Sequence, residues 1–121
     1  MKRILIAEDR PPSRELMRAV LESAGYEVFE AVDGDDAIKT AFNTPIDLVL
    51  LDLQMPKADG FAVVSRLRSD SRFANTPIVA VTASAMHGDR ERALSAGFSG
   101  YIAKPVDLNV LRSEVRRLIG E

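Results

Sequence analysis

Four apolar runs in this chain end in side chains that can bind an ion or react. In chain order, these ends carry Glu8 and Asp9, then Asp52, Thr82 and Lys104. A carboxylate at the end of a buried strand is costly unless it has partners or borders a ligand crevice. Carboxylate oxygens without histidine or cysteine suit a hard cation such as Mg²⁺, and the same oxygens would accept Mn²⁺. The pattern therefore predicts a cation site that gathers several strand ends.

The charges of these side chains indicate phosphoryl chemistry. One divalent cation and the ammonium of Lys104 would offset the three carboxylates, so a further anion could enter the site. Asp52 can act as a nucleophile, because carboxylates form aspartyl-phosphates. Phosphoryl transfer requires mainly in-line positioning and neutralisation of the equatorial oxygens. The cation, Lys104 and the Thr82 hydroxyl would supply those contacts.

The elements that must position these side chains alternate along the whole chain. Apolar runs predict strands at Ile4–Ala7, Tyr26–Ala31, within Ile46–Gly60 up to about Asp52, Ile78–Thr82 and Tyr101–Ala103. Apolar spacing and capping residues predict helices from Pro11 to about Gly25, Asp33 to Asn43, Gly60 to about Leu67, Asp89 to Ala96 and Asp107 to Ile119. This alternation predicts an α/β fold, a three-layer, doubly wound sheet of five parallel strands. The reactive strand ends then share one edge of the sheet.

The first and the last predicted helices each carry an apolar face, which we expect to be buried. In the first helix this face consists of Leu16, Met17, Val20, Leu21 and Ala24. In the last helix it consists of Leu108, Leu111, Val115, Leu118 and Ile119.

Composition narrows the class of protein. The 121 residues suit one domain, residues 1–121, with enough surface to bury a core without metal or disulfide. The absence of cysteine excludes disulfides, zinc-thiolate sites and cysteine nucleophiles. A net charge of −2 does not favour a nucleic-acid surface. No apolar run approaches a membrane span, and the first residues, Met-Lys-Arg-Ile, lack the pattern of a signal-peptide cleavage site. We therefore expect a cytoplasmic domain that binds no membrane.

At this point the sequence resembles the receiver domain of two-component response regulators, over its whole length. The matching segments are ILIAED, DLVLLDLQMPKADG, PIVAVTA and YIAKP, in the order and at the spacing of that family. The resemblance implies the flavodoxin-like (βα)5 fold with strand order 2-1-3-4-5. It also implies that Asp52 accepts a phosphoryl group from a phosphohistidine on a histidine kinase or a histidine phosphotransfer protein. The chain would then be a signalling phosphoacceptor that catalyses only its own phosphorylation and dephosphorylation, and not an enzyme acting on other substrates.

The resemblance assigns further roles around Asp52. Asp9 and Asp52 would ligate Mg²⁺ directly, together with the main-chain carbonyl of Gln54, and Glu8 would act mainly through water. The peptide bond between Lys104 and Pro105 would be cis, which proline permits at low cost.

A switch is implied as well. In the phosphorylated state Thr82 would bond the phosphoryl group and Tyr101 would turn inward, altering the surface made by the fourth helix, fifth strand and fifth helix. From the residues alone, an ordinary half-buried aromatic is the favoured interpretation of Tyr101.

Three positions are expected to modulate this chemistry. Arg10 follows the acidic pair where the family often carries a small polar or acidic residue. Its guanidinium could pair with Glu8, reach the phosphoryl group or simply be solvated. Gln54 could orient a hydrolytic water, whereas Ser84 is too short to help, so we expect an aspartyl-phosphate lifetime of minutes or more. The single histidine, His87, has no second histidine or cysteine with which to bind a metal.

Other classes of protein fit less well. Haloacid-dehalogenase phosphatases form an aspartyl-phosphate but carry a second aspartate two residues later, where this chain has Gln54. A flavodoxin-like FMN carrier needs a phosphate loop rich in serine, threonine and glycine after the first strand, where this chain has EDRPPSRE. An unphosphorylated, degenerate receiver is disfavoured because none of the expected site side chains is missing.

The output of such a receiver must come from a downstream protein target, because no second domain is predicted. The chain is either a stand-alone receiver or one cut from a hybrid kinase or a larger regulator. The segment VTASAMHGDRERALSAGFSGYIAKP resembles stand-alone and hybrid-kinase receivers, which favours a phosphorelay. We expect a monomer or weak dimer that does not bind nucleic acid directly.

Overall fold

The computed structural model describes residues 1–83 and 89–120 and contains a five-stranded parallel sheet with strand order β2-β1-β3-β4-β5. The strands are β1 (Arg3–Ala7), β2 (Glu27–Ala31), β3 (Leu48–Asp52), β4 (Ile78–Thr82) and β5 (Gly100–Ala103). The helices are α1 (Pro11–Ser23), α2 (Gly34–Asn43), α3 (Gly60–Arg68), α4 (Asp89–Ala96) and α5 (Leu108–Ile119), with a 3₁₀ turn, η1 (Ser71–Phe73). The predicted fold class and strand order are therefore confirmed. Ser84 and His87 lie outside the described residues.

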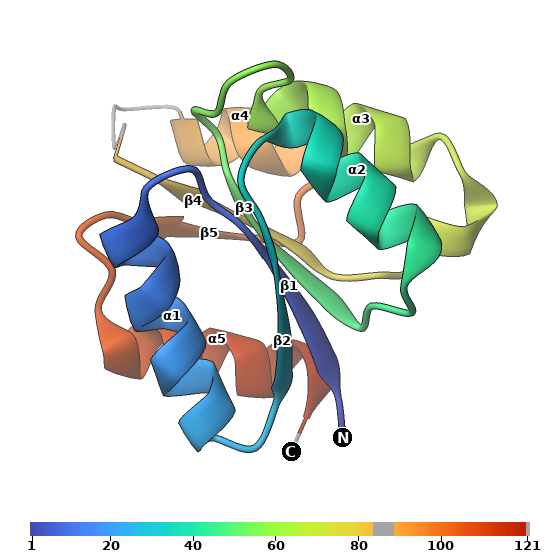
Figure 1. Cartoon of the computed structure of the whole chain (residues 1–121). Helices are drawn as coiled ribbons and strands as arrows, with labels where there is room; N and C mark the ends of the chain where they lie inside the picture. Colours follow the sequence, from blue (N-terminus) through green and yellow to red (C-terminus); the bar gives the residue numbers. More distant parts are fainter. Residues whose placement is uncertain (84–88, 121) are drawn as a thin grey trace.

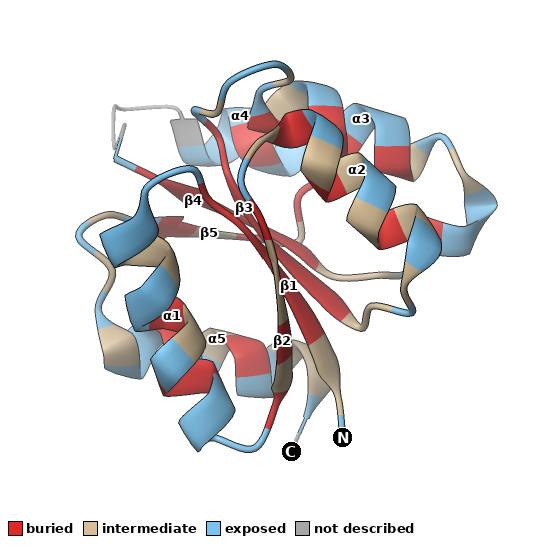
Figure 2. Cartoon of the chain, viewed as in Figure 1, coloured by how far each residue is buried: buried red, intermediate tan, exposed pale blue. Residues whose placement is uncertain are grey.

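The helices cover both faces of the sheet (Figure 1). Helices α1 and α5 lie on one face, and α2, α3 and α4 lie on the other. Each face buries its own apolar cluster, and the strands between them are the most completely buried part of the chain (Figure 2). All five residues of β3 and of β4 are buried. This explains why those two strands are continuous apolar runs in the sequence, without polar alternation.

The carboxyl ends of the inner strands meet at one edge. In the register of the sheet, Ala7 pairs with Leu51 and Asp52 pairs with Val81. Asp52 is thus the last residue of the central strand, flanked by β1 on one side and β4 on the other. The connection after β1 carries Glu8, and the connection after β5 carries Lys104.

Two features of the helices differ from the predictions. Leu16 is 50% exposed and Ala24 is exposed as well, so the buried stripe of α1 is only Met17, Val20 and Leu21. The stripe is narrow because α1 packs on β1, β2 and the neighbouring helix α5 at the edge of its layer, and its other flank faces solvent. The turn η1 was not predicted, since it depends on Asp70, whose side chain accepts the backbone N–H of Arg72 at 2.8 Å.

Candidate functional site

The acidic strand ends converge as the sequence predicted. Carboxylate oxygens of Glu8, Asp9 and Asp52 lie within 4.8 Å of one another. They border a pocket of about 200 Å³ whose lining is more polar than apolar, with side chains from Asp9, Arg10, Asp52, Gln54, Ala83 and Lys104. Of the three acids, Glu8 and Asp52 are buried and Asp9 is exposed. An incoming ion would therefore meet Asp9 first and the buried pair behind it.

Lys104 bridges the two buried carboxylates. Its Nζ donates to Glu8 Oε1 at 2.5 Å and to Asp52 Oδ2 at 3.0 Å. Glu8 is fully buried, and the Lys104 side chain is 15% exposed. Since a buried charge needs a partner, Lys104 allows both carboxylates to remain in this interior position.

The neighbours of Asp52 set its protonation. The pKa of Asp52 is raised to about 6, by burial first and by the adjacent Glu8 carboxylate as well, against the opposing bonds from Gln54 N–H and Lys104. Burial also pushes the pKa of Glu8 upward, but the hydrogen bond from Lys104 and the other hydrogen bonds it makes outweigh this and lower it. At neutral pH both carboxylates are ionised. The surroundings disfavour the ionised form of Asp52 and favour that of Glu8.

The oxygen atoms of Glu8 and Asp52 are held by backbone groups as well. Glu8 Oε2 accepts the backbone N–H of Arg10 at 3.2 Å, and Asp52 Oδ1 accepts the backbone N–H of Gln54 at 3.0 Å. Both oxygens of Glu8 and both oxygens of Asp52 therefore already accept hydrogen bonds. The exposed carboxylate of Asp9 is the one most open to an incoming cation.

These residues fit a divalent cation. Three carboxylates and one ammonium leave the cluster with two negative charges, which one Mg²⁺ would balance. The donor set consists of hard oxygens beside an open polar pocket, and this arrangement suits an ion that retains several waters.

The remaining predicted residues have distinct environments. Thr82 is fully buried at the end of β4, and its carbonyl accepts the backbone N–H of Lys104 at 2.7 Å. Tyr101 is half-buried on β5 and lines a separate hollow of about 510 Å³ between α4 and α5. The Lys104–Pro105 peptide bond is cis, as the family resemblance implies.

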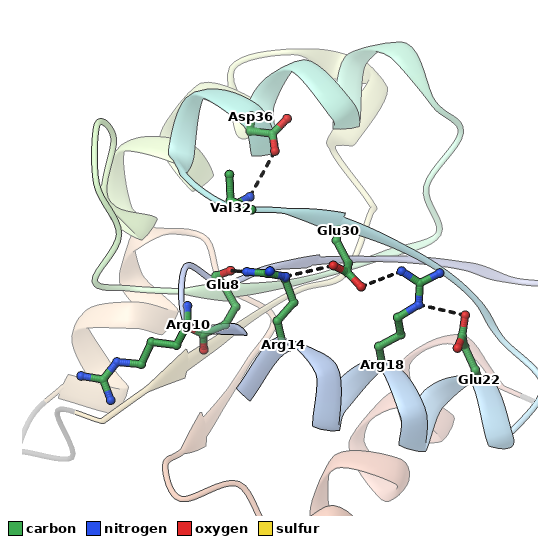
Figure 3. A network of polar contacts seen from close by, with 8 residues as sticks. All are labelled: Glu8, Arg10, Arg14, Arg18, Glu22, Glu30, Val32 and Asp36. Carbon is green, nitrogen blue, oxygen red and sulfur yellow. Dashed lines mark hydrogen bonds and ion pairs between the residues drawn. The ribbon is translucent and has the colours of Figure 1, made fainter. Parts of the chain in front are cut away.

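Arg10 lies at the rim of the pocket and is exposed. Figure 3 shows its guanidinium pointing away from the Glu8 carboxylate, which is bound by the Arg10 backbone instead. The predicted pairing of the Arg10 guanidinium with Glu8 is therefore not made among the described residues, and only the Arg10 main chain bonds that carboxylate. A contact with a phosphoryl group stays a prediction.

The sequence did not predict the role of Gly34, against which the loop after Asp52 packs closely. A Cβ on Gly34, the first residue of α2, would lie 2.0 Å from the carbonyl oxygen of Ala58. The Gly34 N–H also donates to the carbonyl of Pro56 at 3.3 Å, and Lys57 Nζ lies 3.6 Å from Asp33 Oδ2. From sequence, Asp33-Gly34 was interpreted only as a turn and helix cap. The loop that follows the candidate nucleophile is therefore packed on the start of α2.

Gly34→Ala is expected to destabilise the protein by about 1–3 kcal/mol, the usual cost of overpacking. Alanine would normally favour a helix over glycine, but here its methyl group would displace the backbone of Ala58. The free energy of unfolding from urea denaturation measures the effect. The control is Gly100→Ala, whose methyl group would meet the movable carboxylate of Glu114 at 3.2 Å and the side chains of Val79 and Arg117 at ordinary contact distances of 3.7 and 3.8 Å. Equal losses in the two variants would contradict the prediction.

In the part of the chain that the structure describes, no helix is long and apolar enough to cross a membrane.

Comparisons with known proteins identify the family. The model of the response regulator receiver domain matches residues 4–116. The transcriptional regulator RpaA of Synechocystis sp. is 40% identical over 119 residues, which are 98% of this chain but 49% of RpaA, so the chain spans about half the length of that relative. The polar-differentiation response regulator DivK of Brucella anthropi is 33% identical over 120 residues, 99% of this chain and 98% of DivK.

Among solved structures, the receiver domain of sensor histidine kinase PA1611 from Pseudomonas aeruginosa superimposes with a TM-score of 0.90 and 36% identity. The match covers 99% of this chain and 98% of that one, and that structure holds a magnesium ion in its active-site cleft. The converging strand ends, the sheet order and these matches agree. This chain belongs to the response regulator receiver domain family of two-component signalling systems.

Proposed function

We propose that this chain, residues 1–121, is a signalling phosphoacceptor that takes a phosphoryl group from a phosphohistidine onto Asp52. The donor would be a histidine kinase or a histidine phosphotransfer protein. The observation that supports this most directly is the position of Asp52, buried at the end of the central strand within 3.0 Å of the Lys104 ammonium and beside two further carboxylates.

Each residue of the site would have a separate role in phosphoryl transfer to Asp52. An oxygen of Asp52 forms the new bond to phosphorus while the bond from phosphorus to the histidine nitrogen breaks, and the histidine leaves with the electron pair of that bond. Lys104 and the hydroxyl of Thr82 would neutralise and bond the oxygens of the transferred group. Asp9, Asp52 and the carbonyl of Gln54 would hold Mg²⁺, with Glu8 acting through water. The cation supplies charge neutralisation for the phosphoryl group.

Phosphorylation would then change a protein-binding surface. Thr82 would bond the phosphoryl group and Tyr101 would turn toward the interior, so that the face made by α4, β5 and α5 changes shape. The hollow lined by Tyr101 already lies on this face. A downstream protein would recognise the change in the cytoplasm, and the receiver would act as a monomer or weak dimer, alone or within a longer protein. The alternative is a receiver that forms part of a longer protein, and the similarity to the receiver domain of a sensor histidine kinase supports it.

The test is phosphorylation by acetyl phosphate in the presence of Mg²⁺, followed by intact mass. Wild type is expected to gain one phosphoryl group and Asp52→Asn none, because the amide is no nucleophile. Asp35→Asn, a change of the same kind at an exposed residue of α2, should leave the yield unchanged. Omitting Mg²⁺ should abolish the gain in wild type. Modification of the Asp52→Asn protein to the wild-type extent would show that another residue is the acceptor.

A further inference from the structure

A chain of ion pairs joins α1 to β2 beside the acidic strand ends (Figure 3). Arg14 Nε donates to Glu30 Oε1 at 2.9 Å, and Arg18 Nη1 donates to Glu30 Oε2 at 2.6 Å. Arg18 Nε also donates to Glu22 at 3.0 Å. Hydrogen bonds, from Arg18 first and from Arg14 as well, lower the pKa of Glu30, so Glu30 is ionised at neutral pH. The two arginines thus share one carboxylate.

Only one of the two arginines reaches the site. Arg14 Nη1 donates to the backbone carbonyl of Glu8 at 2.9 Å. The Nε of Arg18 instead donates to Glu22, which lies on α1 itself. The side chain of Arg14 is 14% exposed, and that of Arg18 is 41% exposed. Arg14 is therefore a largely buried bridge between Glu30 and the turn that holds the acids.

The start of α1 has no side-chain cap, so the contact from Arg14 is one of the few bonds that tie the first turn of α1 to the end of β1. The N-cap residue of α1 is Arg10, which makes no side-chain capping bond, and the helix begins with Pro11-Pro12. The turn between β1 and α1 is held by backbone bonds from Glu8 N–H to Ala31 and from Arg10 N–H to Glu8 Oε2. The Arg14 guanidinium adds a further hydrogen bond to this turn, to the carbonyl of the peptide that joins Glu8 to Asp9.

We propose that Arg14 is a positioning residue for cation binding, because it fixes the Glu8–Asp9 peptide from α1 while Glu30 fixes Arg14. The proposal rests on the proposed function, in which Asp9 is a direct ligand. The direction of that peptide determines where the Asp9 carboxylate points. Groups that hold a ligand residue in place commonly change metal affinity by about 10–100-fold when they are replaced.

Charge and geometry make opposite predictions for this residue. A cation close to the site disfavours a second cation, so loss of positive charge at Arg14 would by itself strengthen Mg²⁺ binding. Lysine retains the charge but lacks the planar fork that lets arginine bond a carbonyl and a carboxylate together. Arg14→Lys therefore isolates the positioning effect.

The experiment compares Arg14→Lys with Arg18→Lys by calorimetric titration of Mg²⁺ into each protein. Both variants keep the charge and alter a bond to Glu30, but only Arg14 contacts the Glu8 carbonyl. We expect Mg²⁺ to bind about tenfold more weakly to Arg14→Lys, near the lower end of the range for such groups, and to bind Arg18→Lys as it binds wild type. Affinity in Arg14→Lys equal to or above that of wild type would overturn the proposal, as would equal losses in both variants.

A second readout uses the metal-free proteins. Amide hydrogen exchange at Glu8 and Arg10 should be faster in Arg14→Lys than in wild type, with exchange in β3 unchanged. Unchanged exchange at both amides would overturn the proposal. If Arg14→Lys does not fold, Glu30→Gln is compared with Glu22→Gln, which removes the same charge from the same network without touching Arg14. Weaker Mg²⁺ binding in Glu30→Gln than in Glu22→Gln supports the proposal, and equal affinities overturn it. Failure of the wild type to bind Mg²⁺ would instead be a failure of the proposed function.

Discussion

Asp52→Asn is expected to make the metal-free protein more stable than wild type at neutral pH, by about 2–3 kcal/mol, at 1.4 kcal/mol per unit of pKa shift. Burial raises the pKa of Asp52 to about 6 from an ordinary value of 3.8, which means that the fold disfavours the ionised side chain. Asparagine has no charge to bury, and its oxygen can still accept the Gln54 N–H. A candidate nucleophile is thus held at a cost to stability.

The sign of the pH dependence follows from the same shift. The folded protein binds a proton at Asp52 more tightly than the unfolded chain does. Protonated Asp52 therefore contributes stability below pH 3.8, and this contribution is lost as the pH rises through about 6. The advantage of Asp52→Asn over wild type should accordingly be small near pH 4, grow between pH 4 and 6, and level off by about pH 7.

Urea denaturation of both proteins across this pH range measures the difference, and Asp35→Asn controls for loss of a negative charge in general. Mg²⁺ should shrink or reverse the advantage, since the cation stabilises the carboxylate of wild type and has fewer ligands in the variant. An advantage that is independent of pH, or a variant less stable than wild type at pH 7 without metal, would contradict the assigned environment of Asp52.

The sequence was sufficient to predict the strand ends and what they carry. Alternating strands and helices place every strand's carboxyl end at one edge, so Glu8, Asp52 and Lys104 had to lie near one another. The boundaries of most elements followed from glycine, proline and aspartate near helix ends, such as Asp107, which caps α5 by accepting the N–H of Asn109 and Val110.

What could not be predicted depends on contacts between segments that are distant in sequence. Gly34 has the appearance of a turn residue until Ala58 is brought against it. Arg14 has the appearance of a solvated charge on a helix until β1 and β2 place Glu8 and Glu30 on either side of its guanidinium. Leu16 satisfies the helical spacing, yet no element covers its side of α1 in the described structure. Periodicity defines a face, and only packing decides how wide that face is.

Lys104→Met is expected to destabilise the metal-free protein by about 3–5 kcal/mol at pH 7, the cost of leaving a buried charge without its partner. Glu8 is fully buried, and Lys104 is the ammonium that bonds both Glu8 and Asp52. Methionine fills a similar volume, so the loss reports charge and not a cavity. Arg117→Met is the control, because its ion pair with Glu114 lies at the surface, where solvent screening leaves little of its contribution to stability.

Two further measurements distinguish this explanation from a general loss of packing. Without Lys104, the pKa values of Glu8 and Asp52 both rise, so the defect should diminish toward pH 4 as protonation removes the uncompensated charges. Mg²⁺ should restore part of the stability, because it brings the missing positive charge to the same oxygens. Adding Glu8→Gln to Lys104→Met should also recover stability, whereas Glu8→Gln alone should lower it, since the single change removes a partner of Lys104. A Lys104→Met defect that is the same at pH 4 and pH 7, and that neither Mg²⁺ nor Glu8→Gln relieves, would mean that Lys104 stabilises the fold through its aliphatic chain and not as the counter-ion of the site.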